Sequence, residues 1–173
     1  ALATATQRVD LGTYVLIQSL YDPMAGAERT ALIDNLSGGR LILGVGQGYN
    51  ELYWRMFGLR SEHRLSRFIE GLDVLKKAWT STEPFDHTGK FWKFNDMTVH
   101  PKPIQSPHPP VWVAASSHKS MERVAKHDWN LMVGQGESFE HVAEQIEYYK
   151  IAIGEEGFEY NSGRVTVARA MYT

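Results

Sequence analysis

Residues 36–49 carry the strongest structural signal in this chain. They are Leu36-Ser37-Gly38-Gly39-Arg40-Leu41-Ile42-Leu43-Gly44-Val45-Gly46-Gln47-Gly48-Tyr49. The short, nearly continuous apolar run at 40–46 is typical of a strand that is buried on both faces. Gly38 and Gly39 indicate the end of a preceding helix, because glycine adopts the left-handed conformation of a helix terminus at little cost. The stretch therefore predicts a helix that ends near residue 36, followed by a central strand of a parallel sheet.

Strands and helices alternate on both sides of this segment. The predicted strands are 8–17, 40–46, 111–115, 131–133 and 164–171, and the predicted helices are 23–36, 65–79, 116–126 and 138–153. Such alternation predicts parallel strands joined by right-handed crossovers, and hence an α/β fold. Two architectures remain open. A five-stranded doubly wound sheet fits 173 residues, whereas a (β/α)₈ TIM barrel typically needs about 250, so the chain would be part of one.

Residues 81–110 interrupt the alternation. The turn His87-Thr88-Gly89-Lys90 lies between two short predicted strands, 85–86 and 91–94, which indicates a hairpin. Five of the seven prolines follow between Pro101 and Pro110, so that part is expected to be extended and not helical. We interpret 81–110 as a hairpin and proline-rich insertion.

The composition excludes several classes of protein. With 18 basic and 20 acidic residues the net charge is −2, which argues against nucleic-acid binding. No apolar run approaches the roughly 20 residues that a membrane span requires. Because the chain has no cysteine, disulfides and cysteine-ligated metals are excluded, and a cytoplasmic location is expected. The seven histidines are scattered without the spacing of a metal site, so no metal is predicted. Only His118 lies at a predicted strand end.

Two groups of residues at predicted strand ends are candidates for ligand binding. Gly44, Gly46 and Gly48 resemble a dinucleotide fingerprint superficially, but the next clearly predicted helix begins more than ten residues later, so close backbone packing is the favoured interpretation. The second group is Ser116, Ser117 and Ser120 at the start of a predicted helix. Backbone amides and hydroxyls there suit a phosphate, although Ser117 alone would serve as an ordinary helix cap.

Taken together, residues 36–49 and several motifs in the same order resemble the bacterial-luciferase-like flavin-dependent oxidoreductases. The motifs are Leu11-Gly12-Thr13, Phe57-Gly58, the helix Phe68 to Trp79, Gly89-Lys90-Phe91-Trp92, His100-Pro101-Lys102-Pro103, and Pro109-Pro110-Val111-Trp112-Val113. The resemblance covers nearly the whole chain. It implies an incomplete (β/α)₈ barrel domain over residues 1–173 that supplies strands three to seven, with the 81–110 insertion between strands four and five.

The resemblance also implies a function. The expected cofactor is FMN, and the expected activity is oxidation of a small organic substrate by O₂, with a flavin reductase as partner and a homodimer of the full-length protein. Two alternatives remain open: a deazaflavin-dependent hydride-transfer enzyme, and a non-redox domain that binds a phosphate-bearing ligand. The isolated chain is expected to be inactive. The catalytic histidine of the family follows strand two, outside this chain, so no catalytic residue is assigned.

The family pattern places the flavin against specific residues of this chain. A non-proline cis peptide that packs under the flavin ring is expected at or next to Tyr14-Val15. Gln47, Gly48 and Tyr49 would flank the cofactor, and Ser116, Ser117 and Ser120 would hold its phosphate. Three positions depart from luciferase itself: Gln47 replaces an arginine, Ser116 an acidic residue and Gly134 a tryptophan.

Overall fold

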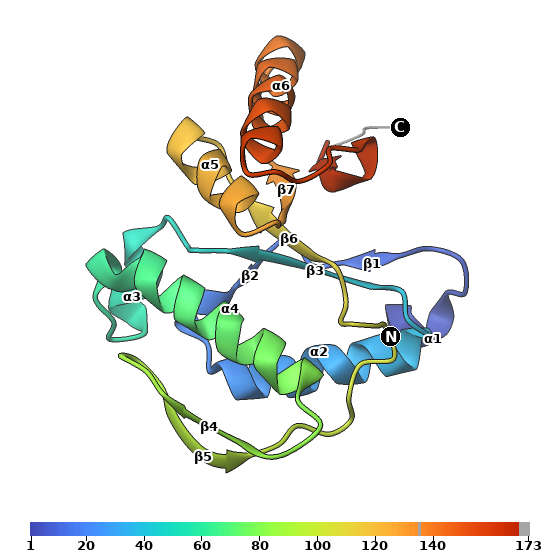
Figure 1. Cartoon of the computed structure of the whole chain (residues 1–173), viewed down its shortest axis with the longest axis vertical. Coiled ribbons are helices and arrows are strands. Elements are labelled where there is room, and N and C mark those ends of the chain that lie inside the picture. Colours follow the sequence, from blue (N-terminus) through green and yellow to red (C-terminus); the bar gives the residue numbers. More distant parts are fainter. Residues whose placement is uncertain (135, 170–173) are drawn as a thin grey trace. The chain divides into compact units, whose positions relative to one another are not determined.

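The computed structural model describes residues 1–134 and 136–169. They fall into two compact units, one formed by Ala1–Pro110 and one by the described part of Val111–Thr173. Figure 1 labels the elements. The first unit contains α1 (Leu2–Ala5), β1 (Leu11–Gly12), β2 (Leu16–Ile17), η1 (Gln18–Leu20), α2 (Pro23–Ser37), β3 (Leu41–Gly46), α3 (Glu51–Met56), η2 (Ser61–His63), α4 (Arg64–Thr80), β4 (Phe85–Thr88) and β5 (Lys93–Met97). The second contains β6 (Val111–Ala114), α5 (His118–Lys126), β7 (Asn130–Val133), α6 (Phe139–Glu155), η3 (Ser162–Arg164) and β8 (Val165–Val167).

The helix and strand predicted around residues 36–49 are confirmed. Asp22 caps α2 by accepting hydrogen bonds from the amides of Met24 and Ala25, and Gly38 ends the helix in the left-handed conformation with φ 70°. β3 follows and pairs in parallel with both β1 and β2. Leu41, which begins β3, is only 2% exposed, as expected of a strand that is buried on both faces.

The predicted strand 8–17 is broken, which corrects the sequence interpretation. Leu11–Gly12 pairs with Leu41–Ile42, whereas Leu16–Ile17 pairs with Val45–Gly46. Four positions separate Gly12 from Leu16, but only three separate Ile42 from Val45, so one extra residue is accommodated between the two pairings. An extra residue of this kind is a bulge, which re-aims neighbouring side chains.

The helices α2 and α4 pack against each other, and Figure 1 shows them on one side of β1 and β3. α4 matches the predicted helix 65–79, and its apolar positions Phe68, Leu72 and Leu75 are fully buried. The antiparallel hairpin β4–β5 lies beyond these helices. The predicted hairpin is confirmed, but its turn spans residues 89–92 and not 87–90, because His87 and Thr88 belong to β4 and pair with Phe94 and Lys93.

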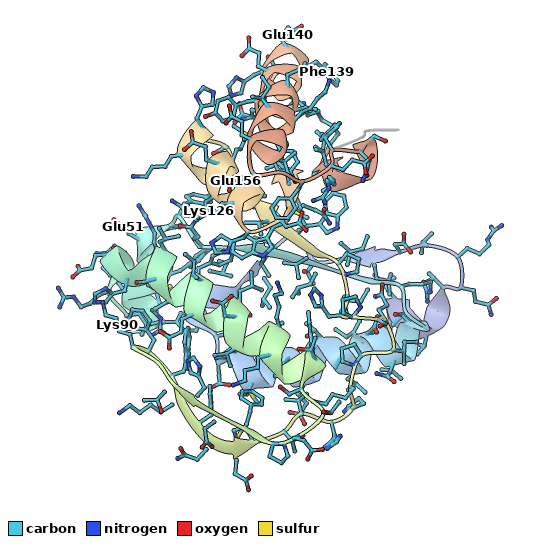
Figure 2. All side chains as sticks on the ribbon, in the orientation of Figure 1. Glu51, Lys90, Lys126, Phe139, Glu140 and Glu156 are labelled. Atoms are coloured by element: carbon cyan, nitrogen blue, oxygen red, sulfur yellow. The ribbon has the colours of Figure 1, made fainter. Side chains whose placement is uncertain are left out.

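A carboxylate on α4 holds the hairpin. The Glu70 side chain accepts hydrogen bonds from the backbone amides of Lys90, Phe91 and Trp92 at 3.0–3.2 Å and lies 3.2 Å from the ring of His87. Figure 2 labels Lys90 at the turn. Burial acts to raise the pKa of Glu70, but these hydrogen bonds outweigh it and the pKa is lowered.

Glycine is required at position 89 by the same arrangement. A Cβ added to Gly89 would lie 2.0 Å from Oε1 of Glu70 and 2.5 Å from Nε2 of His87. The glycine of the Gly-Lys-Phe-Trp motif at 89–92 is therefore explained by a close approach of the hairpin backbone to the half-buried carboxylate of Glu70.

The proline-rich segment between β5 and β6 is not helical, as predicted, and a buried carboxylate holds it. Asp34 at the end of α2 is fully buried, and its carboxylate accepts hydrogen bonds from the amide of Ile104 at 2.8 Å and from the amide and side chain of Gln105. The His100–Pro101 and Ser106–Pro107 peptides are cis.

In the second unit, β6 pairs in parallel with β7 and β7 with β8. α5 and α6 pack against each other (Figure 1). β8 ends at Val167, whereas the sequence predicted a strand over 164–171. Residues 170 and 171 of that prediction lie outside the described residues. Both units thus confirm an α/β fold with parallel strands.

Within residues 1–134 and 136–169, no helix has the length and apolar character needed to cross a bilayer.

Candidate functional site

The candidate residues of the first unit flank the paired strands β2 and β3, with Tyr14 and Val15 directly before β2 and Gln47, Gly48 and Tyr49 directly after β3. Ile17 pairs with Gly46, and the chain then continues from β3 through Gln47, Gly48 and Tyr49. The peptide between Tyr14 and Val15 is cis, as the family resemblance implies. All five predicted residues of this unit therefore lie in segments that adjoin one pair of parallel strands, β2 and β3.

Two aromatic side chains of this group are open to solvent. Tyr49 is 90% exposed and Tyr14 is 48% exposed, whereas Gln47 and Gly48 are half-buried. Thr13 donates a hydrogen bond from its hydroxyl to the carbonyl of Gly44 at 2.7 Å, which ties the bulged segment to β3. Aromatic faces and backbone groups are thus the chemistry that this loop offers to a ligand.

Gly48 occupies a position that only glycine satisfies. Its φ is 76°, and an added Cβ would lie 2.6 Å from Cγ2 of Ile17. Its carbonyl accepts a hydrogen bond from the indole of Trp54 at 2.9 Å, so the first turn after the loop is fastened to it. These contacts support the close-packing interpretation of the glycines.

The expectation that the next helix begins more than ten residues after the glycines is wrong. α3 starts at Glu51, three positions after Gly48, with Asn50 as its cap (Figure 2). Its six residues include only one buried side chain, Trp54, so the helix has little of the apolar periodicity that would have revealed it.

A support for this loop was not predicted from the sequence. The hydroxyl of Ser19, which is fully buried in η1, donates to the carbonyl of Gln47 at 2.6 Å. The carbonyl of Ser19 in turn accepts a hydrogen bond from Nε of Arg67 on α4 at 3.0 Å. Because these contacts join residues 28 and 48 positions apart, no local motif signals them.

In the second unit, the three candidate serines lie at the start of α5 as predicted. Ser117 is the N-cap residue, and its hydroxyl accepts a hydrogen bond from the amide of Ser120 at 3.3 Å. The hydroxyl of Ser120 accepts one from the amide of Ser117 at 3.0 Å, which completes a capping box. The capping role of Ser117 is therefore confirmed, while phosphate binding stays a prediction.

A buried glutamine supports the same segment. Gln145 on α6 is 2% exposed and donates from Nε2 to the carbonyl of Ser116 at 3.0 Å. On α6, Gln145 is buried whereas the adjacent Ile146 is only half-buried. Hydrophobic periodicity missed Gln145 because its amide is polar.

The donor chemistry of both groups fits a flavin phosphate and ring. Ser116 and Ser117 are exposed hydroxyls beside the first-turn amides of α5, which are the usual donors to a phosphate. Tyr14 and Tyr49 offer exposed aromatic surface of the kind that packs on a planar ring. Lys119, also exposed, adds a positive charge to the serine group.

His118, the histidine that was predicted at a strand end, is the first residue of α5. His118 stacks on Tyr148 with ring centroids 3.9 Å apart. Among the described residues, no cluster of three or more His, Asp or Glu side chains is arranged to hold a metal ion.

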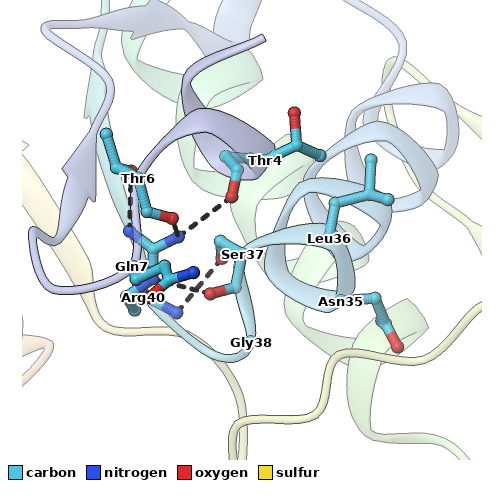
Figure 3. A pocket seen from close by; sticks show the side chains of 9 residues that line it. Thr4, Thr6, Gln7, Asn35, Leu36, Ser37, Gly38 and Arg40 are labelled. Atoms are coloured by element: carbon cyan, nitrogen blue, oxygen red, sulfur yellow. Dashed lines mark hydrogen bonds between the residues drawn. The ribbon is translucent and has the colours of Figure 1, made fainter.

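A pocket of about 600 Å³ lies at the other end of β3 (Figure 3). Arg40 contributes to its wall, but its guanidinium donates to the carbonyls of Ala3, Thr6, Val9 and Ser37 and to the Thr6 hydroxyl. All five N–H groups of an arginine are thereby used. This arginine of the 36–49 motif is therefore structural and does not serve an anionic ligand.

Comparison with known proteins gives one consistent family. The family description "luciferase-like monooxygenase" matches residues 1–173. The oxygenase component of the flavin-dependent trigonelline monooxygenase of Acinetobacter baylyi is 34% identical over 134 residues, or 76% of this chain and 37% of the relative. The FMNH₂-dependent dimethylsulfone monooxygenase of Pseudomonas putida is 31% identical over 151 residues, or 85% of this chain and 40% of the relative.

A solved structure agrees with these relatives. The monooxygenase RslO1 from Streptomyces bottropensis superposes with a TM-score of 0.85 at 28% identity, covering 95% of this chain and 50% of that one.

An F420-dependent glucose-6-phosphate dehydrogenase of Kineococcus radiotolerans is 35% identical over 117 residues, which are 66% of this chain and 34% of the relative. The chain thus spans half or less of the length of the proteins that it matches.

Proposed function

Because the chain belongs to the luciferase-like monooxygenase family, whose members are flavin-dependent oxidoreductases, we propose that the protein is an FMN-dependent monooxygenase that oxidises a small organic substrate with O₂. The observation that carries this proposal is the family match over residues 1–173. Two relatives named as flavin-dependent or FMNH₂-dependent monooxygenases support it further.

The proposal assigns the two candidate groups to different parts of the cofactor. Ser116, Ser117 and Ser120 would hold the phosphate through hydroxyls and first-turn amides. Tyr14 with Val15, and Gly48 with Tyr49 in the loop after β3, would pack against the ring and shield it from water. When bound, reduced FMN supplies the chemistry that activates O₂, and the protein contributes position and exclusion of water.

Gln47 and Lys119 differ in the charge that each would offer to a cofactor phosphate. A glutamine hydrogen-bonds a phosphate without neutralising it, so affinity from position 47 would be weaker than from an arginine. The exposed ammonium of Lys119 would add a positive charge to the serine group of the second unit.

The first test uses the full-length protein. FMN is titrated against it by fluorescence quenching, and O₂ consumption is then followed with reduced FMN. We expect saturable quenching and flavin-dependent O₂ uptake. Absence of both would refute the proposal.

A deazaflavin enzyme is the second candidate, because an F420-dependent dehydrogenase is among the relatives. Titration with F420 in parallel with FMN separates the two. Binding of F420 without affinity for FMN would replace the monooxygenase by a hydride-transfer enzyme. The non-redox alternative has less support, because the three relatives named above are two monooxygenases and a dehydrogenase.

Several further proposals depend on the whole protein. We propose that the chain supplies strands three to seven of a (β/α)₈ barrel, with residues 81–110 inserted between strands four and five. The protein would act in the cytoplasm, receive reduced flavin from a separate reductase and form a homodimer.

A further inference from the structure

We propose that Arg67 and Ser19 are positioning residues that hold the loop after β3 in its cofactor-binding conformation. This inference rests on the proposed function and deepens it. In the first unit, these two side chains keep the backbone of Gln47, and therefore of Gly48 and Tyr49, in place.

Two consecutive hydrogen bonds connect Arg67 to the loop after β3 through Ser19. Nε of Arg67 donates to the carbonyl of Ser19 at 3.0 Å, and the hydroxyl of Ser19 donates to the carbonyl of Gln47 at 2.6 Å. Ser19 is fully buried, so water does not replace either bond when it is lost. The orientation of the Gln47 peptide thus depends on a side chain of α4.

The hairpin fixes the other side of the guanidinium. The Arg67 group lies over the ring of Trp92 at 4.6 Å and over that of Phe91 at 5.2 Å. The amides of these same two residues are held by Glu70, one turn further along α4. A planar guanidinium can donate in its plane and stack on aromatic rings with its face, which a lysine cannot do.

This arrangement gives the 81–110 insertion a role in the site. Its hairpin restricts Arg67, Arg67 restricts Ser19, and Ser19 restricts the loop that carries three of the candidate flavin contacts. Tyr49, at 90% exposure, has few contacts of its own to hold it, so its placement depends on the backbone before it.

The test compares flavin affinity and stability in full-length variants. Ser19→Ala removes the bond to Gln47, Arg67→Met removes the guanidinium, and Arg67→Lys retains the charge and one donor. Thr30→Ala is the matched control, because the Thr30 hydroxyl is also buried and donates to the carbonyl of Gly26 at 2.6 Å within α2.

We expect Ser19→Ala and Arg67→Met each to weaken flavin binding about five-fold, the effect of losing one hydrogen bond. Arg67→Lys should lie between Arg67→Met and the wild type. The flavin affinity of the double variant should be no lower than that of the weaker single variant, because Arg67 acts on the Gln47 peptide only through Ser19. Thr30→Ala should lower the melting temperature without changing the flavin Kd.

The outcomes separate this inference from the proposed function. If the wild type binds FMN or F420 and both single variants bind it equally well, the positioning role is refuted while the proposed function stands. If the wild type binds neither, both are refuted. If Arg67→Met fails to fold, the flavin Kd of Ser19→Ala is compared with that of Thr30→Ala. Equal Kd values in these two variants would likewise refute the positioning role.

Discussion

Three charged side chains of the first unit bind backbone groups of distant segments. Arg40 holds the first ten residues, Asp34 holds the proline-rich segment and Glu70 holds the hairpin turn. Hydrogen bonds to charged groups are stronger than neutral ones, and a single such residue can therefore fasten a segment that lacks regular structure. These three charged residues therefore stabilise the fold that carries the candidate site of the first unit.

Glu70→Gln tests this role through the pH dependence of stability. The pKa of Glu70 is below its ordinary value of 4.5, so the carboxylate stabilises the fold above that pH. The contribution is lost as the pH falls through the lowered pKa of the folded state. We expect the variant to lose about 2 kcal/mol at neutral pH, and its difference from the wild type to shrink in acid.

Thermal unfolding of the full-length protein at several pH values measures this effect. Glu83→Gln, an exposed position before the hairpin, is the control and should follow the wild type throughout. A constant difference between Glu70→Gln and the wild type down to the acid limit would contradict the assignment.

Among the elements, α5 combines a structural and a proposed binding role at one terminus. Ser117 caps α5 and Ser138 caps α6, each by accepting a hydrogen bond from a backbone amide of its own first turn. Loss of a cap costs about 1 kcal/mol in either helix. Only the first of the two caps belongs to the proposed phosphate group.

Ser117→Ala and Ser138→Ala therefore form a matched pair. Both should lower the free energy of unfolding by about 1 kcal/mol, but only Ser117→Ala should raise the Kd for FMN. Denaturant titration and flavin fluorescence of the full-length variants give the two quantities. Equal FMN affinity in both variants would show that Ser117 caps the helix and does nothing more.

The elements differ in how well the sequence reveals them. α4 was predicted from its apolar period, and α2 from Asp22, Pro23 and the terminal Gly38. α3 was not predicted, because a short helix that buries only Trp54 has no periodic pattern of apolar residues in its sequence. The break between β1 and β2 was not predicted either. A bulge is defined by how one strand pairs with another, here with β3, so the sequence of residues 8–17 alone does not reveal it.

For the molecule as a whole, we predict that the 173-residue chain alone is poorly soluble or only loosely packed. It spans 37–40% of the two monooxygenase relatives and exposes large apolar side chains such as Met56 at 70% and Phe139 at 78%. Exposed apolar surface of this kind promotes association. Calorimetry should show a broad transition, and FMN binding should be weaker than in the full-length protein. A sharp melt with undiminished FMN affinity would contradict this prediction.

Local sequence chemistry was sufficient for the α/β class, the parallel strands, the presence of the hairpin and the position of the serines at the start of α5. Each depends on periodicity, capping residues or turn residues that are close together in the chain. The cis peptide at Tyr14–Val15 was also predicted, although from family resemblance and not from local chemistry.

The supports of the site emerged only from the folded structure. Arg67, Ser19 and Gln47 are joined by two hydrogen bonds that span 48 and 28 positions, and Gln145 reaches Ser116 across 29. A polar side chain in the sequence carries no sign of which distant carbonyl it will meet, because that depends on how the helices pack. The amino-acid pattern therefore specified where the candidate binding residues lie, and tertiary packing specified what holds them there.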